Sequence, residues 1–305
     1  MKALLHVGVD STNLGVSAPI FTDQTFEYIP IAESIAQTKK YLMKHPKGWL
    51  FVWDFGKQQE SDEYPWLPSS VAKTYSEIHV DHSTSGKGHG AFLKDYIPAR
   101  YGQAVVHYDP DFNYSTYADR VDDQRGKQLR LLDPEDYLVF VASLAPYEKK
   151  GYNGDRTQGQ IARYQRHSMA KYLIGYFKVR EVYRVKFNTR HFKKDFSRVL
   201  RIFPKDEVSD RSKRAMQIDV SLKEQISMNA HSIRDLDEYY VALGLKKESG
   251  RLRFALRITE LGSPFKADER GKEIFNEAFP RGWKWVSKEP QLANLLEILD
   301  ASSIT

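Results

Sequence analysis

Residues 133–187 constrain the fold more than any other part of the chain. The segment 137–144 is an unbroken apolar run with the length and the β-branched and aromatic content of a buried strand. Within residues 173–187, apolar side chains share one parity (Leu173, Phe177, Val179, Tyr183, Val185 and Phe187) and cations share the other (Lys178, Arg180, Arg184 and Lys186). A period of two predicts a half-buried strand with a basic outer face. A glycine inside it, Gly175, marks a bulge or a close approach of backbone or ligand.

The two predicted strands resemble the centre of PUA-like barrels, in particular those of the EVE and ASCH types. In those barrels an acidic residue opens a strand that ends in Phe or Tyr, and a strand with Ile, Gly and Val follows across a loop. The matching residues here are Asp136, Phe140, Ile174, Gly175 and Val179. The resemblance implies a fold that faces nucleic acid and whose relatives often accommodate a flipped or modified base.

The composition is typical of a globular protein, with 41% hydrophobic and 28% charged residues. Because no repeat or low-complexity segment divides the 305 residues, we expect one composite domain, 1–305.

No apolar run approaches the roughly 20 residues of a membrane span. The first residues lack the features of a secretory signal, so we expect a cytoplasmic protein without a membrane partner. The absence of cysteine excludes disulfides, thiolate metal sites and the zinc deaminase route to base chemistry.

Positive charge is concentrated in one part of the chain. The net charge is +6, and residues 178–214 hold thirteen Lys or Arg against five Asp or Glu, interleaved with phenylalanines. This pattern suits phosphate contact combined with base stacking. A helix-rich insertion, about 188–228, whose phenylalanines face the core would produce the same pattern. The candidate contacts to a DNA backbone are Lys178, Arg180, Arg184, Lys186, Arg190, Lys193 and Lys194.

Two N-terminal segments carry candidate chemistry. Residues 4–9 predict a short buried strand that delivers Asp10 and Asn13 into a turn. Polar groups at the end of a core strand are a common way to hold a reactive group on rigid support, although the same residues can simply cap the turn. Residues 18–31 predict two extended segments around a polar turn at 22–25. Glu27 lies between aromatic residues there, where burial would raise its pKa and suit it to acid–base catalysis.

Three further segments are assigned from local pattern. Residues 31–44 have helical spacing, and residues 49–56 (WLFVWDFG) predict another strand. Residues 77–90 contain potential metal ligands and alternating glycines, but the spacing matches neither a metal motif nor a P-loop. A polar loop is therefore the favoured interpretation of 77–90, and a phosphate-contacting loop is the second. The potential ligands are His79, Asp81, His82 and His89.

The densest chemical segment is 104–120 (AVVHYDPDFNYSTYADR). A short strand leads into His107, Asp109 and Asp111, which would project to one face of an extended chain. An imidazole beside two carboxylates suits activation of water or stabilisation of positive charge on a sugar. The aromatic residues suit stacking on an extruded base, and they include Tyr108, Tyr114 and Tyr117. The alternative is an Asp-Pro-Asp turn, because Pro110 interrupts the strand.

The C-terminal third supplies one more candidate pair and the end of the fold. Asn229 and His231 can read a base edge or orient a water and a leaving base, and they can equally cap the segment that follows. Residues 239–245 and 253–258 predict a closing hairpin. Residues 268–299 predict two helices separated by 280–290, with tryptophans packing against the barrel.

The order of the motifs resembles the nucleotide modification associated domain 3 family. The motifs are GVDSTNLG, APIF with TDQTFEYIPI, HYDPDFNYSTYAD, DYLVFVASL with YLIGYFKV, and NAH at 229–231, and they follow one another from residue 8 to residue 231. Two positions depart from the family pattern, since Ala118 and Glu135 stand where Gly is usual. The resemblance implies a link to hypermodified DNA in phages and their hosts, through modification, recognition or counter-phage processing of bases.

These observations together predict an α+β fold with a PUA-like mixed β-barrel core, the basic insertion and a C-terminal helical cap at about 265–305. The expected function is a DNA glycosylase acting on modified bases of double-stranded DNA, in the context of anti-phage defence. The target nucleotide would flip into a pocket formed by the three tyrosines, with Asn13, Glu27, Asp109 and Asn229 around the base. Asp10 or Asp111 would act at the sugar, and His107 and His231 would assist base departure.

Such hydrolysis needs no metal or organic cofactor. A non-catalytic reader of modified DNA and a base-modifying transferase remain alternatives, because the same pocket serves all three. The sequence does not indicate the oligomeric state or the modification.

Overall fold

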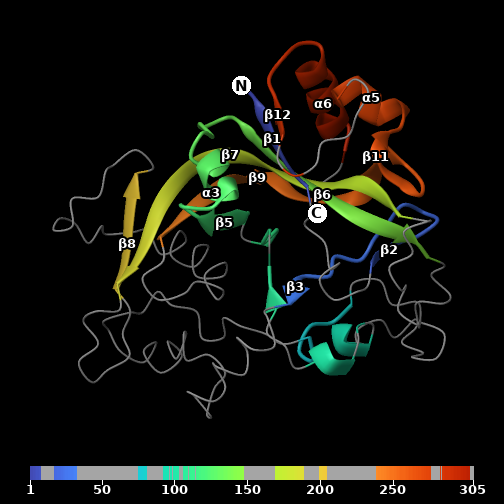
Figure 1. Ribbon diagram of the computed structural model, residues 1–305, viewed down its shortest axis with the longest axis horizontal. Helices are drawn as coiled ribbons and strands as arrows, with labels where there is room; N and C mark the ends of the chain where they lie inside the picture. Colours follow the sequence, from blue (N-terminus) through green and yellow to red (C-terminus); the bar gives the residue numbers. More distant parts are fainter. Residues whose placement is uncertain are drawn as a thin grey trace.

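A curled, mixed β-sheet forms the centre of the molecule (Figure 1). The structure, a computed structural model, describes residues 1–7, 17–32, 75–80, 92–95, 97, 99–102, 106–108, 110–113, 115–147, 169–188, 199–204, 238–275, 282 and 284–302. Its main sheet has eight strands in the order β12 (Lys284–Val286), β1 (Ala3–Val7), β6 (Tyr137–Pro146), β7 (Ala170–Asn188), β9 (Glu238–Arg257) and β5 (Thr116–Arg120). Two further strands lie off this path, β2 (Ala18–Ile20) beside β6 and β8 (Val199–Pro204) beside β7.

The two strands predicted from residues 133–187 are confirmed as β6 and β7. Every residue of β6 before Pro146 is buried, as its unbroken apolar run predicts. β6 runs parallel to β1 and β2 and antiparallel to β7. The predicted strand at 4–9 is found as β1, with residues 8 and 9 outside the described part of the chain.

Simple alternation fails along β7. All residues from Ala170 to Phe177 are buried, and Leu173 and Phe177 share a parity yet pack into different hydrophobic clusters. The reason is a set of register shifts, the first between Leu173 and Gly175, which rotate the following side chains. Gly175 confirms the predicted bulge and close approach, because a Cβ there would lie 2.2 Å from Cε1 of Phe112. The half-buried pattern therefore begins only at Lys178.

The sheet curls so that its distant strands face one another. β1 and β5 are separated by three strands, yet the rings of His6 and Tyr117 lie with centroids 4.8 Å apart. The enclosed side, called the inner face, carries Tyr117, Phe140 and Phe177 in one hydrophobic cluster. The described residues thus show a mixed α+β fold with a half-barrel sheet (Figure 1).

The opposite, outer face is covered by the two C-terminal helices that the sequence predicts. These are α5 (Glu269–Phe275) and α6 (Gln291–Asp300). Ile274, Leu292 and Leu295 pack in a cluster that includes Leu5 and Val139 of the sheet. Strand β12 lies between the helices in sequence and pairs with β1 at the edge of the sheet. In it, Trp285 donates a hydrogen bond of 2.6 Å to Oε1 of Gln128.

Smaller elements lie around this core. A short helix, α3 (Gln124–Leu129), follows β5. The strands β10 (Thr259–Glu260) and β11 (Ser263–Ala267) form a hairpin, and β3 (Ile31–Ala32) pairs with β4 (Val106–His107). Two 3₁₀ turns, η3 (Leu93–Asp95) and η4 (Ala99–Tyr101), complete the described elements. The polar turn predicted at 22–25 is present, where the amide of Thr25 donates to Oδ1 of Asp23 at 3.1 Å.

Two predictions from local pattern are wrong. Residues 239–245 and 253–258 do not form a hairpin, because β9 is one strand that runs antiparallel to β7. Residues 245–248, a Leu followed by three exposed charged residues, leave the ladder between the pairs Val179↔Gly244 and Phe177↔Ser249. They form a bulge where the sequence suggests a turn. The helix expected from residue 31 does not begin there, since Ile31 belongs to β3. Residues 33–44, the strand at 49–56 and most of 188–228 lie outside the described residues.

Candidate functional site

The structure describes part of the predicted site. Asp10, Asn13, Asp109, Tyr114, Arg190, Lys193, Lys194, Asn229 and His231 lie outside the described residues. For His107 and Lys186 only the positions in β4 and β7 are described. The remaining predicted residues are Glu27, Tyr108, Asp111, Tyr117, Lys178, Arg180 and Arg184.

Several of these residues belong to segments that pack on the inner face of the sheet. We call His6, Glu27, Tyr28, Asp111, Phe112 and Tyr117 the inner-face cluster. Pairing of β3 with β4 brings the segment after Glu27 beside the segment before Asp111. The hydroxyl of Tyr28 donates to the carbonyl oxygen of Pro110 at 2.9 Å, and its ring meets that of Phe112 with centroids 5.4 Å apart. Tyr108 is half-buried against the same hydrophobic cluster.

Asp111 closes a tight turn while its side chain stays buried. The carboxylate is 1% exposed, and its Oδ1 accepts a hydrogen bond of 3.0 Å from the amide of Asn113. Backbone hydrogen bonds of 3.0 and 3.1 Å join Asp111 and Thr116. This turn spans 111–116, and the predicted Asp-Pro-Asp turn stays a prediction because Asp109 lies outside the described residues. Glu27 is also 1% exposed, so two carboxylates are held out of water near aromatic rings, an environment that suits acid–base chemistry.

His6 brings an imidazole that the motif analysis did not single out. It is 2% exposed and packs against Tyr117 and, at a centroid distance of 6.2 Å, against Phe140. Burial lowers the pKa of His6 well below its usual 6.5, and the charge of Arg125 lowers it further. The ring is therefore neutral at pH 7. The only feature of the sequence that could have pointed to His6 is that it is a single polar residue within an apolar strand, four positions before Asp10.

A polar chain leads from this cluster toward the surface. Tyr117 has no exposed area, and its hydroxyl donates to Oδ2 of Asp119 at 3.1 Å. Nη1 of Arg125 lies 3.7 Å from the same oxygen. Burial raises the pKa of Asp119, and the charge of Arg125 opposes that shift. Because Tyr117 is enclosed, it supports the cluster in the described structure and does not line an open pocket.

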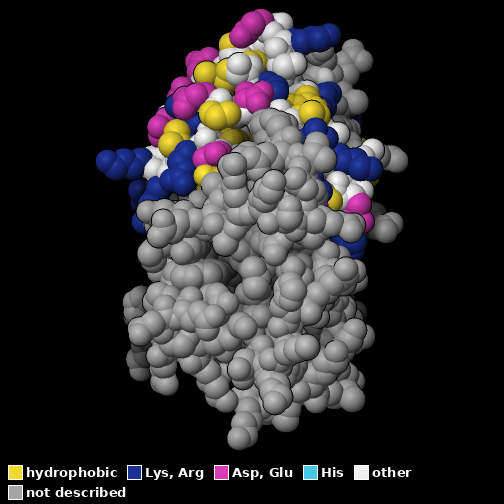
Figure 2. All heavy atoms as spheres, turned by 90° about the vertical axis from the view of Figure 1, so that its left-hand side faces the viewer, with side chains coloured by type: hydrophobic (Ala, Val, Ile, Leu, Met, Phe, Trp, Pro, Cys, Tyr) yellow, Lys and Arg dark blue, Asp and Glu magenta, His cyan; other side chains and the backbone are white. Residues whose placement is uncertain are grey.

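The predicted basic face of β7 is largely compensated by carboxylates. Nζ of Lys178 lies 2.7 Å from Glu248 and 3.0 Å from Glu135, and these two carboxylates raise its pKa. Arg184 forms an ion pair with Glu238. Arg180 is exposed. On the face drawn in Figure 2, described Lys and Arg side chains are interspersed with Asp and Glu, so the visible charge is mixed.

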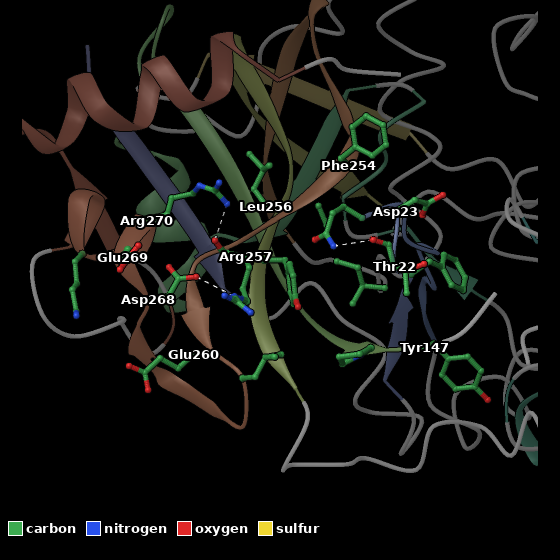
Figure 3. A pocket seen from close by; sticks show the side chains of 18 residues that line it. Thr22, Asp23, Tyr147, Phe254, Leu256, Arg257, Glu260, Asp268, Glu269 and Arg270 are labelled. Carbon is green, nitrogen blue, oxygen red and sulfur yellow. Dashed lines mark hydrogen bonds and ion pairs between the residues drawn. The ribbon is translucent and has the colours of Figure 1, made fainter. Parts of the chain in front are cut away.

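A large cleft opens where β9 passes α5, and we call it the β9–α5 cleft (Figure 3). Its volume is about 1240 Å³, and it extends from the turn at Thr22 and Asp23 to Arg270 of α5. Two of its charged side chains, Arg257 and Asp268, are paired with each other. Nε of Arg257 donates to Oδ2 of Asp268 at 3.2 Å, and Arg270 donates to the carbonyl of Arg257 at 3.2 Å. An exposed aromatic ring, Phe254, stands on the other side.

A second cleft of about 860 Å³ lies beside α3, and we call it the α3 cleft. It is lined by Lys2, Val121, Lys127, Arg130, Leu131, Asp133, Tyr240 and Trp285. Three of these side chains are cations and one is a carboxylate. Its charge balance therefore differs from that of the β9–α5 cleft.

Metal binding finds no support in the described residues, where no group of three or more His, Asp or Glu is placed to hold an ion. His79 is stacked on Phe92 with ring centroids 4.4 Å apart, which accounts for its position by packing. The other potential ligands of the 77–90 segment, Asp81, His82 and His89, lie outside the described residues.

The chain matches no family model, and neither a curated protein nor a solved structure matches it. The resemblances to PUA-like barrels and to the nucleotide modification associated domain 3 family therefore stay predictions from motifs. Glu135 has a φ of 72°, a left-handed conformation that favours glycine. None of the described helices is long and apolar enough to cross a membrane.

Proposed function

We propose that the protein is an enzyme acting on modified bases in DNA, most concretely a glycosylase. The observation that supports this most is the inner-face cluster, which combines two buried carboxylates, Glu27 and Asp111, with the neutral imidazole of His6. Hydrolysis of an N-glycosidic bond needs a carboxylate to stabilise the positively charged sugar or to activate water. It also needs aromatic surface for the extruded base. A metal ion or organic cofactor is not required.

In this proposal the flipped nucleotide enters beside Tyr108 and Tyr114. The carboxylate of Asp111 or Asp10 faces C1′, where the bond to the base breaks and the bond to a water oxygen forms. The water loses a proton to the carboxylate, and the departing base gains one from His107 or His231. His6 adds a second imidazole at the inner face.

The test is release of a free base from modified DNA. Purified protein is incubated with genomic DNA from phages that carry different modified bases, and the small-molecule fraction is analysed by mass spectrometry. Alkaline cleavage of the same DNA reports abasic sites. We expect both signals from one class of modified DNA and neither from unmodified DNA.

Variants separate chemistry from folding. Asp111→Asn keeps an oxygen that can accept from the amide of Asn113, so the turn should persist. We expect it to bind DNA normally and to lose base release by about 100-fold or more. Asp122→Asn is the matched control, because Asp122 is exposed and paired with Arg120. Full activity of both Asp10→Asn and Asp111→Asn would overturn the glycosylase proposal.

A non-catalytic reader of modified DNA is the second candidate. The observation that favours it is the structural use of the inner-face cluster, since Asp111 caps a turn and Tyr117 is enclosed. A reader would bind DNA tightly only when the DNA is modified and would leave it chemically intact. Binding titrations run beside the base-release assay distinguish the two functions.

A further inference from the structure

Two cations of the α3 cleft, Lys127 and Arg130, form no ion pair with a described carboxylate. Lys127 and Arg130 are three residues apart at the end of α3, so their side chains lie on the same side of the helix. Within the described part of the chain neither forms an ion pair, whereas Lys2 lies 3.2 Å from Asp133. Two cations are therefore available to an anionic ligand.

An aromatic and apolar wall stands beside these cations. The indole of Trp285 is held by its hydrogen bond to Gln128, and the ammonium of Lys2 lies 5.1 Å from its ring centroid. Leu131 is 52% exposed although it is apolar. A fixed indole and an exposed leucine next to cations match the combination of base, sugar and phosphate along a nucleic-acid strand.

The cleft lies next to the inner-face cluster in the sheet. Val121, one of its walls, follows directly on β5, the strand that carries Tyr117. Tyr240, another wall, pairs with Asp119 in the β5–β9 ladder. The α3 cleft and Tyr117 of the inner-face cluster are therefore both built on the paired strands β5 and β9.

We propose that the α3 cleft is the site where the protein holds the phosphodiester backbone of DNA. Lys127 and Arg130 contact phosphates, and Trp285 and Leu131 pack against the neighbouring sugar or base. This inference rests on the proposed function and places the main phosphate contacts at α3, because Lys178 and Arg184 of β7 are already paired with carboxylates. Phosphate contacts position a duplex without reading its sequence.

The experiment compares two charge-matched double variants. One is K127Q/R130Q in the α3 cleft, and the control is K272Q/K288Q, two exposed lysines of which the first lies in α5 and the second just before α6. Binding to a labelled duplex is measured by fluorescence anisotropy over a range of salt concentrations. Loss of two phosphate contacts should lower the slope of log K against log salt by about 1.8 and weaken binding at low salt about tenfold or more. The control should keep the wild-type slope.

Trp285 gives an independent readout. Because the indole lines the cleft, duplex binding should change its emission. Trp285→Phe should remove most of that change while the four other tryptophans remain.

Equal losses in the two double variants, or no loss in either, would overturn the inference. A free nucleotide that competes as strongly as the duplex would also overturn it, by identifying a small-molecule pocket. Base release is recorded in the same samples. If base is released and both double variants bind DNA equally well, the inference about the α3 cleft is wrong and the glycosylase proposal stands. If the salt-dependence slopes of the two double variants differ but no DNA releases a base, the inference about the cleft stands and the glycosylase proposal is wrong.

Discussion

The inner-face cluster and the α3 cleft hold polar groups in opposite ways. His6 and Asp111 are 2% and 1% exposed and are packed among aromatic rings, whereas the cations of the cleft, Lys127 and Arg130, face solvent. Burying a polar group costs free energy unless it is hydrogen-bonded, so the cluster is tied to the stability of the fold. Exposed cations contribute little to stability. Substitutions that remove packing or hydrogen bonds from the cluster should therefore change folding as well as function, and substitutions in the cleft should change binding alone.

The largest effect is expected at Gly175, beneath the inner-face cluster. In Gly175→Ala the new Cβ would lie 2.2 Å from Cε1 of Phe112 and 2.7 Å from the carbonyl oxygen of Gly250. Phe112 is itself packed against Phe140 and Phe177, so relief of this overlap requires repacking. We expect a loss of about 3 kcal/mol in the free energy of unfolding, measured with urea. Gly102→Ala is the control, since its Cβ would meet only ordinary contacts at 3.4 and 3.5 Å. Equal effects would contradict the packing argument.

The next effect is a pH dependence caused by His6. Its pKa is lowered in the folded state, so below the usual value of 6.5 the unfolded chain binds more protons than the folded one. The stability from the neutral buried ring is therefore present above pH 6.5 and is lost as the pH falls. Between pH 7 and 5 we expect the free energy of unfolding to fall by about 1 to 2 kcal/mol. His6→Phe should flatten this part of the profile, and an unchanged slope would contradict the assignment.

A smaller effect on stability is expected at Glu135, which is exposed to solvent. Its φ of 72° is strained for a residue with a Cβ, and its carboxylate pairs with Lys178 at 3.0 Å. Because Glu135 is exposed and Lys178 keeps Glu248 as a second partner, we expect the relief of backbone strain in Glu135→Gly to dominate and to raise the free energy of unfolding by about 0.5 kcal/mol. Glu135→Gln, which loses the ion pair and keeps the strain, should be slightly less stable than wild type. Thermal unfolding of the three proteins distinguishes these outcomes.

The smallest effect on stability is expected in the α3 cleft. K127Q/R130Q should change the free energy of unfolding by no more than about 0.5 kcal/mol, because both side chains are exposed and unpaired with carboxylates. Urea unfolding of the variants made for the binding experiment measures this. A loss comparable to that of Gly175→Ala would show that the cleft is part of the core and would break the comparison.

Local pattern predicted the elements better than their partners. The strands β6 and β7 and the helices α5 and α6 follow from runs and periods within short segments. The prediction of a hairpin within β9 was wrong because a bulge rich in charged residues and a turn have similar local composition. The curl of the sheet was not predictable from pattern, since it depends on contacts such as His6 with Tyr117 between residues far apart in sequence.

For the candidate site too, features within short segments were predicted and features that depend on distant segments were not. Glu27 was predicted because it lies between aromatic residues, and Asp111 because it shares one face of an extended chain with His107 and Asp109. His6 was missed, since a single histidine in an apolar strand is no motif. The α3 cleft was also missed, because Lys2, Lys127 and Trp285 come from three distant segments. The cations of β7 were predicted as DNA contacts without the carboxylates that β9 places beside them.

The measurement that tests the account most directly is base release from modified phage DNA by wild-type protein and by Asp111→Asn. The account predicts a free modified base and alkali-labile sites with the wild type, and their loss in the variant with duplex binding retained. DNA that binds the wild-type protein only when modified, yet releases no base and gains no alkali-labile site, would contradict it and establish a reader of modified DNA.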